Sequence, residues 1–267
     1  MDTAIFEEAP ARRRRSGWPW WVRLLVTLLV IGALVGAAEL ALRLILPGII
    51  TGAVQSQLKL PADHPVDVEL GGSQLVSAVG GGVGDVTVSV PDAPLIEGLA
   101  ADVKVHAKRV PFAVTTGEIS DGTAELTVPK EQLSGFAEMV TQGLAQSAEV
   151  RDGGLVVSHT VDMLGQKVPL SATLGLKVVD GKVEIDPKGA SAAGFDLSAT
   201  QIASATGDLL APMLKPHVFC ISDRLPRGVT LTNIELTSSG AVAVSADLSP
   251  KLAADPQERA PGSCAAG

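Results

Sequence analysis

The longest apolar run in the chain lies near its N-terminus. From Leu24 to Ile50 only Glu39 and Arg43 are charged, and this run is longer than the roughly 20 residues that a helix needs to cross a bilayer. Glu39 and Arg43 are four residues apart, in the order that lets them pair on a helix. We therefore expect the membrane to end near Ala38 and the helix beyond it to pack against the rest of the protein.

The residues before this run predict its orientation. Four consecutive arginines at 12–15 and three tryptophans at 18, 20 and 21 precede it, which is typical of a cytoplasmic basic flank followed by an interfacial aromatic belt. The pattern predicts a cytoplasmic tail over 1–17, a single-pass cell-membrane anchor over 18–38 and an extracytoplasmic domain over 39–249. A cleaved signal segment is the alternative, because small residues at 36–38 offer a cleavage site.

Beyond the charged pair the pattern becomes one-sided. Ile50, Val54 and Leu58 recur at four-residue spacing while Gln55 and Ser56 lie elsewhere, which predicts an amphipathic helix. Pro47-Gly48 predicts a break between the anchor and this second helix.

Most of the remaining chain alternates between apolar and polar residues with the period of a half-buried strand. Such segments surround residues 86–90, 103–108, 123–128, 155–163, 168–178, 182–185, 229–236 and 241–248. Asp180-Gly181 predicts a tight hairpin turn. Two amphipathic helices are expected among the strands, near 129–147 and 198–214, and the Pro- and Ala-rich tail over 250–267 is expected to be loose. The fold class predicted is α+β: an N-terminal transmembrane helix, then a mostly antiparallel, twisted sheet packed against amphipathic helices, with space for a lipid groove.

Charge and cysteine content restrict the class of partner and the compartment that we expect. From Pro47 onward 15 Lys and Arg face 25 Asp and Glu, a net formal charge of −10, which argues against a nucleic-acid partner. Cys220 and Cys264 both lie in the predicted exported part, where a disulfide between them would contribute about 4 kcal/mol in the chain-entropy model. Two unpaired thiols are the alternative.

No pattern of catalytic or metal-ligating residues emerges. The glycine run over 80–84 lacks the Lys-Ser/Thr of a phosphate loop and precedes a strand, so a turn is expected. Ser158 and His159 point to opposite faces of a strand and therefore cannot pair as nucleophile and base. The four histidines are scattered, without zinc spacing. We expect no enzyme, no metal and no cofactor.

Basic residues are the candidates for contact with a phosphate. Arg can hold a phosphate through two hydrogen bonds and Lys as a point charge. Two groups qualify, Lys104, Lys108 and Arg109 on one strand and Arg224 and Arg227 around a turn. A solvated strand face that balances nearby acids is the alternative interpretation.

The order of these segments resembles a known family. A single N-terminal apolar segment running into "ELALR", the strand "VDVELGG" and the closing "LPRGVTLTNIELTSSGAVAVSADL" are similar to the LmeA-like phospholipid-binding proteins of actinobacterial cell envelopes. The resemblance covers most of 39–248. It implies an exported, membrane-associated protein that binds phospholipid, phosphatidylinositol-type lipids among them, and supports assembly of envelope glycolipid.

Two functions follow as hypotheses. The first is a lipid-binding or lipid-transfer module at the membrane, with acyl chains in a groove between the helix from Pro47 to Leu58 and one strand; the residues predicted to line it are Ile50, Val54, Leu58, Leu170, Leu174 and Leu176. The second is an extracytoplasmic scaffold that binds no lipid and docks an envelope-synthesis enzyme such as a glycosyltransferase. A tightly packed two-layer core has the same apolar pattern as a groove, so the sequence leaves both open.

Overall fold

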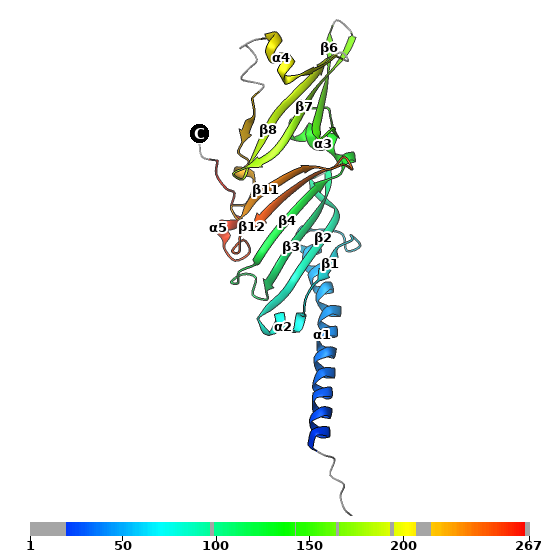
Figure 1. The fold of residues 1–267 in the computed structure, drawn as a ribbon, viewed down its shortest axis with the longest axis vertical. Helices are drawn as coiled ribbons and strands as arrows, with labels where there is room; N and C mark the ends of the chain where they lie inside the picture. Colours follow the sequence, from blue (N-terminus) through cyan, green and yellow to red (C-terminus); the bar gives the residue numbers. More distant parts are fainter. Residues whose placement is uncertain are drawn as a thin grey trace, which may run out of the picture.

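The computed structural model describes residues 20–96, 99–141, 143–163, 166–192, 195–206 and 215–264. Two antiparallel sheets follow one another along the long axis of the molecule, and the long helix α1 (Trp20–Leu58) extends from one end (Figure 1). The α+β class and the antiparallel pairing predicted from the sequence are confirmed, but the strands form two sheets.

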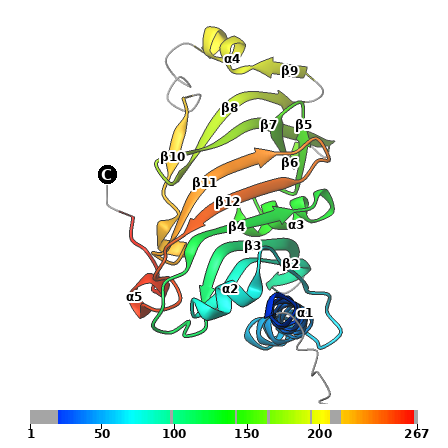
Figure 2. The same cartoon turned by 60° about the horizontal axis from the view of Figure 1, so that its bottom comes forward.

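The first sheet contains strands from both ends of the domain. Its order is β1-β2-β3-β4-β12-β11, so the last two strands of the chain complete a sheet that the first four begin (Figure 2). Val242 of β12 pairs with Val128 of β4 across more than 110 residues of chain. The strands are β1 (Asp67–Leu70), β2 (Gly82–Ile96), β3 (Leu99–Pro111), β4 (Ser120–Val128), β11 (Val229–Leu236) and β12 (Val242–Leu248).

The second sheet is built from the middle of the chain. Its order is β10-β8-β7-β6-β5, with β9 also pairing on β8. Asp180-Gly181 forms the predicted tight turn between β7 and β8, and both residues adopt positive φ angles, 51° and 71°, as such a turn requires. The strands are β5 (Ser147–Arg151), β6 (Gly154–Met163), β7 (Gln166–Val179), β8 (Lys182–Ala192), β9 (Phe195–Ser198) and β10 (His217–Phe219).

The core lies where the two sheets meet under α3 (Lys130–Val140). Leu133 of α3 is buried together with Val128 and Val242 of the first sheet and Ala148 of the second. The apolar stripe predicted for this helix therefore joins the two sheets. The remaining short helices are α2 (Gln74–Val79), α4 (Ala199–Thr206), η2 (Ser222–Arg224) and α5 (Pro256–Arg259). The rest of the helix predicted over 198–214, from residue 207, lies outside the described residues.

The predicted break at Pro47-Gly48 is wrong, because α1 continues through Pro47 to Leu58. Proline removes one backbone donor and usually ends or bends a helix. Here a half-buried stripe with four-residue spacing, formed by Leu42, Leu46, Ile50 and Val54, runs past the proline on both sides. Packing of this one face against β1 and α2 holds the helix together across Pro47.

The tail is also more ordered than expected. Residues 250–264 are described, and Asp255 caps α5 by accepting a hydrogen bond from the N–H of Gln257 at 2.8 Å. The backbone N–H of Gly262 donates to the carbonyl of Leu225 at 2.9 Å, and a disulfide joins Cys264 to Cys220, as the cysteine content predicts. These contacts tie the tail to the segment that precedes β11.

Candidate functional site

Strand alternation gathers the aliphatic residues of both sheets on one side, which we call the apolar face. Residues directly opposite each other on neighbouring strands share a face. In the second sheet the register therefore gives two rows across the strands. One row is Phe195, Ala192, Leu170 and His159; the other is Leu197, Ala190, Ala172, Val157 and Ala148.

Burial decreases across these rows with distance from α3. Ala148 of β5 is in the core under α3, whereas Leu170 of β7 is 37% exposed and Phe195 of β9 is 76% exposed. Leu197 and Phe219 are exposed as well. Among the residues that the structure describes, these exposed side chains form an apolar surface on the β8–β9 side of the apolar face.

A small cleft lies on this surface. It has a volume of about 220 Å³ and is lined by Leu144, Ala145, Val157, Ser158, His159, Leu170, Ser171 and Ala172. Its main components are aliphatic side chains on β6, β7 and the segment after α3. Leu170 belongs both to this cleft and to the exposed side of the apolar face.

One polar group stands out in this aliphatic surface. The Nδ1 atom of His159 is buried and has no hydrogen-bond partner among the described residues. A buried polar atom without a partner is costly. His159 lies beside Leu170 in the same row, so this strand position combines an apolar environment with one unused polar atom.

The structure brings only half of the predicted groove residues together. Leu170, Leu174 and Leu176 all lie on β7, and Leu170 lines the cleft. Ile50, Val54 and Leu58 lie on α1, which packs against β1 and α2 at the opposite end of the domain (Figure 1). The predicted groove between this helix and β7 is therefore not formed, because α1 follows the edge of the first sheet and β7 belongs to the second.

The basic candidates are spread over the molecule. Lys108 lies 3.8 Å from Asp121, and the Nε of Arg227 donates to the carbonyl of Pro261 at 3.3 Å. Lys104 lies opposite Glu125 on the polar face, while Arg224 is in η2. Arg109 is at the end of β3, with its guanidinium close to Gly80. The structure does not assemble these five residues into one site.

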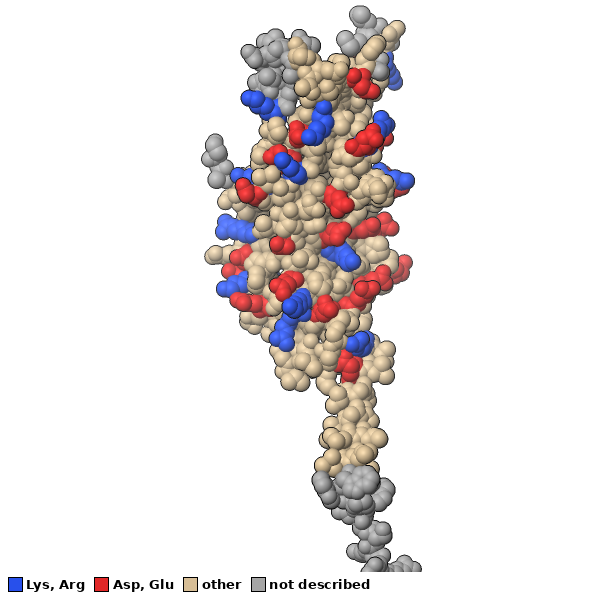
Figure 3. Space-filling view, viewed as in Figure 1, with Lys and Arg blue, Asp and Glu red and all other residues tan. Residues whose placement is uncertain are grey.

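The polar face of the second sheet bears a wider cleft. It has a volume of about 450 Å³ and is lined mainly by polar residues of β6 to β9. Two of its cations have anionic neighbours, since Arg151 pairs with Glu149 and Lys188 with Asp186. Elsewhere on this face a hydrogen bond and the charge of Glu184, 2.8 Å away, raise the pKa of Lys177. Mutually neutralised charges of this kind are typical of a solvated surface, and Figure 3 shows the two signs intermingled over the sheets.

Ser158 and His159 do not form a catalytic pair. Ser158 pairs with Ser171, whereas His159 pairs with Leu170 on the other side of the strand, as alternation requires. No group of three or more His, Cys, Asp or Glu residues in the described part of the chain could hold a metal ion.

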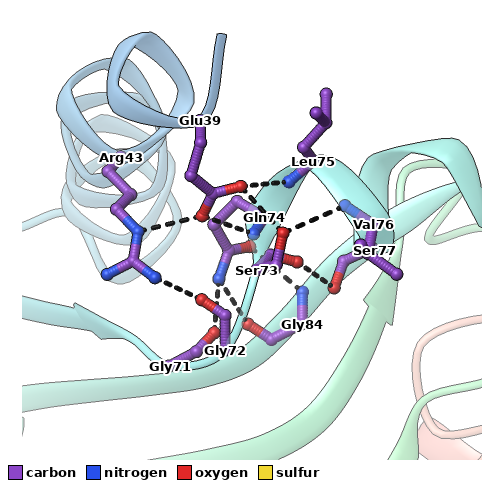
Figure 4. Close-up of polar contacts among 10 residues, drawn as sticks. All are labelled: Glu39, Arg43, Gly71, Gly72, Ser73, Gln74, Leu75, Val76, Ser77 and Gly84. Atoms are coloured by element: carbon purple, nitrogen blue, oxygen red, sulfur yellow. Dashed lines mark hydrogen bonds and ion pairs between the residues drawn. The ribbon is translucent and has the colours of Figure 1, made fainter. Parts of the chain in front are cut away.

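A group of hydrogen-bonded polar residues joins α1 to the domain (Figure 4). Of its contacts, the sequence predicts only the Glu39–Arg43 pair. Glu39 pairs with Arg43 at 2.9 Å, as their spacing predicts. The same carboxylate also accepts hydrogen bonds from the backbone N–H groups of Gln74 and Leu75, at 2.8 and 2.7 Å, and from the hydroxyl of Ser73 at 2.9 Å. Glu39 thus caps α2 from a position 34 or more residues earlier in the chain.

Gln74 connects this junction to the first sheet. It is fully buried, and its side-chain amide donates to the carbonyls of Gly71 and Gly84, at 2.7 and 3.0 Å. Arg43 extends the junction by donating to the carbonyl of Gly72. Neither α2 nor Gln74 was predicted; the only sequence signal is Ser73, a favourable helix N-cap residue in a segment too short for a visible periodicity.

Comparison with known proteins shows a family. The model of a family described as LmeA-like phospholipid-binding matches residues 37–246, which is most of the chain and includes both sheets except the last two residues of β12. No curated protein and no solved structure matches the chain. The part of α1 from Leu24 to Leu58 is long and apolar enough to cross a membrane, and an N-terminal signal sequence meets the same criterion.

Proposed function

The chain belongs to the LmeA-like phospholipid-binding family, and we propose that it holds phospholipid acyl chains on the open, β8–β9 side of its apolar face. Family membership supports a lipid ligand. The observation that favours this place is the gradient of exposure from Ala148, in the core, to Leu170 and Phe195.

The chemistry of this surface suits flexible hydrocarbon. Covering apolar surface contributes about 25 cal/mol per Å², and an exposed aliphatic patch of this kind usually marks a ligand or partner site. Among the described residues, this surface contains one buried polar atom without a hydrogen-bond partner, the Nδ1 of His159. Such a surface discriminates little between acyl chains, so any preference for a lipid class has to come from the headgroup.

The cellular placement is part of the proposal. The N-terminal half of α1 serves as an anchor, the arginines at 12–15 stay in the cytoplasm and the two sheets stand on the extracytoplasmic side. The Cys220–Cys264 disulfide supports an oxidising compartment. We extend the proposal to phosphatidylinositol-type lipids and to envelope glycolipid assembly on the family resemblance alone.

Arg109 is the basic residue best placed for an incoming headgroup. It lies on the apolar-face side of β3, at the end of the first sheet where α1 leaves the domain. Lys104 and Lys108 point to the polar face of the same strand. In this proposal Arg109 contacts the phosphate of a lipid that enters from the membrane, and the chains then move along the apolar face.

Photochemical cross-linking of the full-length chain in nanodiscs tests the proposal. The bilayer contains a phospholipid with a diazirine at the end of one acyl chain, and cross-linked peptides are mapped by mass spectrometry. We expect cross-links to residues of β6 to β9 in addition to α1, because the bilayer itself labels α1. Cross-links confined to the N-terminal part of the chain would refute lipid binding on the second sheet and leave the scaffold for an envelope enzyme as the remaining hypothesis.

A further inference from the structure

A cluster of exposed apolar side chains lies at the end of the first sheet from which α1 emerges. Val79 of α2 is 86% exposed and Phe112, just after β3, is 55% exposed; Val76 and Val114 are exposed beside them. The backbone N–H of Phe112 donates to the carbonyl of Gly81 at 3.0 Å, so the end of α2 and the start of the β3–β4 loop are neighbours. We call these four residues the end patch.

The end patch is free of charge in its own sequence. Residues 71–84, which contain α2, and residues 110–117, which contain the loop, include no Asp, Glu, Lys or Arg. This differs from the two sheets, where charges of both signs are scattered over the face seen in Figure 3. A cluster of exposed apolar residues within an uncharged segment is unusual on a surface that faces water only.

The apolar outer side of α1 lies next to the end patch. Glu39 and Arg43 are the only charges between Leu24 and Leu58, and both are directed at α2 and the residues before it (Figure 4). The side of α1 that faces away from the domain stays apolar and exposed beyond them, at Leu40, Leu44, Ile45 and Ile49, with Leu44 72% exposed. The charged pair therefore bonds to the domain and does not mark contact with water on the outer side of the helix.

The length of α1 can be compared with the thickness of a bilayer. Trp20 begins the helix, next to the aromatic belt, and Glu39 is 19 residues further on, which corresponds to about 28 Å at 1.5 Å per residue. The hydrocarbon core of a bilayer is roughly 30 Å thick, and the headgroup layers bring the total to about 40–45 Å. Because Glu39 bonds directly to Ser73, Gln74 and Leu75, an anchor with Trp20 at one edge of the hydrocarbon core would bring α2 to the other edge.

We propose that the end patch inserts into the headgroup layer of the lipid bilayer from which α1 emerges, so that the domain stands on the membrane with the end of its first sheet in the lipid. This rests on the anchor role proposed above for α1. Val76, Val79, Phe112 and Val114 then contact lipid, and Leu40 and Leu44 on the outer side of α1 lie in the same layer. Arg109, close to Gly80 at the end of α2, is placed at the level of the phosphates.

Site-specific fluorescence of the full-length chain in nanodiscs tests this. Single cysteines at Val79 and Phe112 are labelled with the environment-sensitive dye NBD, and the native cysteines do not interfere because they form a disulfide. Val218 supplies the matched control, since it is 51% exposed on β10, in the other sheet. We expect the dye at 79 and 112 to show blue-shifted emission and at least threefold stronger quenching by spin-labelled phospholipid than the dye at 218. Equal, water-like emission and quenching at all three positions would overturn the proposal.

A charge substitution separates insertion from simple proximity. Val79→Asp adds a carboxylate at a side chain that is almost fully exposed, so the fold is expected to persist, as circular dichroism can verify. If the patch is inserted, the dye at position 112 loses most of its quenching in this variant, whereas Val218→Asp leaves it unchanged. Unchanged quenching in a folded Val79→Asp protein would contradict insertion. The acyl-chain cross-links to β6 to β9 report on lipid binding separately, so either proposal can fail while the other stands.

Discussion

Leu170→Asp is the substitution that most directly separates an open lipid surface from an ordinary core. Leu170 is 37% exposed and lines the 220 Å³ cleft. Full burial of a leucine side chain contributes about 1.5–3 kcal/mol, and roughly two thirds of this residue is covered, so losing its contacts costs about 1–2 kcal/mol. The new carboxylate can reach water across the open side of the cleft, and it therefore adds little to that cost.

The expected effect on lipid binding is larger. An aspartate in the path of an acyl chain removes the equivalent of two or three methylene contacts, at about 0.8 kcal/mol each. The total of about 2 kcal/mol corresponds to roughly a 30-fold weaker interaction. In the nanodisc experiment the mole fraction of photoactivatable lipid needed for half-maximal labelling of β6 to β9 should rise by about this factor, while labelling of α1 stays constant as an internal standard.

The control is Val218→Asp, which places the same charge at a half-exposed residue of the same sheet. Val218 lies opposite Glu184, on the polar face, so we expect unchanged cross-linking. Urea unfolding of each variant, followed by circular dichroism, gives the stability change. Two results would refute the reasoning: wild-type labelling of β6 to β9 in Leu170→Asp, or a loss of more than about 4 kcal/mol in its free energy of unfolding, which is the cost expected of an uncompensated charge in a closed core.

Three further predictions concern the junction, the disulfide and the topology. Glu39→Ala removes the acceptor of the Gln74 and Leu75 N–H groups. Hydrogen exchange of the α2 amides should become at least tenfold faster, because hydrogen bonds to a charged group contribute about 1.5–3 kcal/mol. Glu131→Ala, at an exposed residue of α3, is the control, and equal exchange rates in both variants would contradict the role assigned to Glu39. Cys264→Ser opens the 44-residue separation closed by the disulfide and should lower the free energy of unfolding by up to about 4 kcal/mol in the chain-entropy model; an undiminished value in the absence of reductant would count against the bond. A phosphatase reporter, which is active only outside the cytoplasm, should be active when it is fused to the C-terminus. Activity of a cytoplasm-specific reporter at the same point would contradict the proposed orientation.

Local patterns were sufficient for the class of fold and for most elements. A strand with one buried face needs alternating apolar and polar residues, and a tight turn with positive φ angles favours Asp-Gly. Both requirements act within a few residues, so the sequence of β7 and β8 is sufficient to predict these strands and their turn. The Glu39–Arg43 pair is equally local, because a helix brings residues four apart together. The family resemblance, now supported by the match over 37–246, likewise depends on the order of such segments.

The tertiary structure decided what those elements contact. Periodicity shows that Ile50 and Leu174 each lie on an apolar side of an element, but it carries no information about which element covers them; α1 follows β1, and β7 belongs to the other sheet. The helix crosses Pro47 because its packing on both sides outweighs a local cost. Glu39 binds α2 across 34 or more residues of chain. In the sequence this charge indicates where the membrane ends, whereas in the structure it forms hydrogen bonds to the domain. Long-range packing alone fixes these contacts, since the free energy of an apolar surface or a charge depends on what finally covers it.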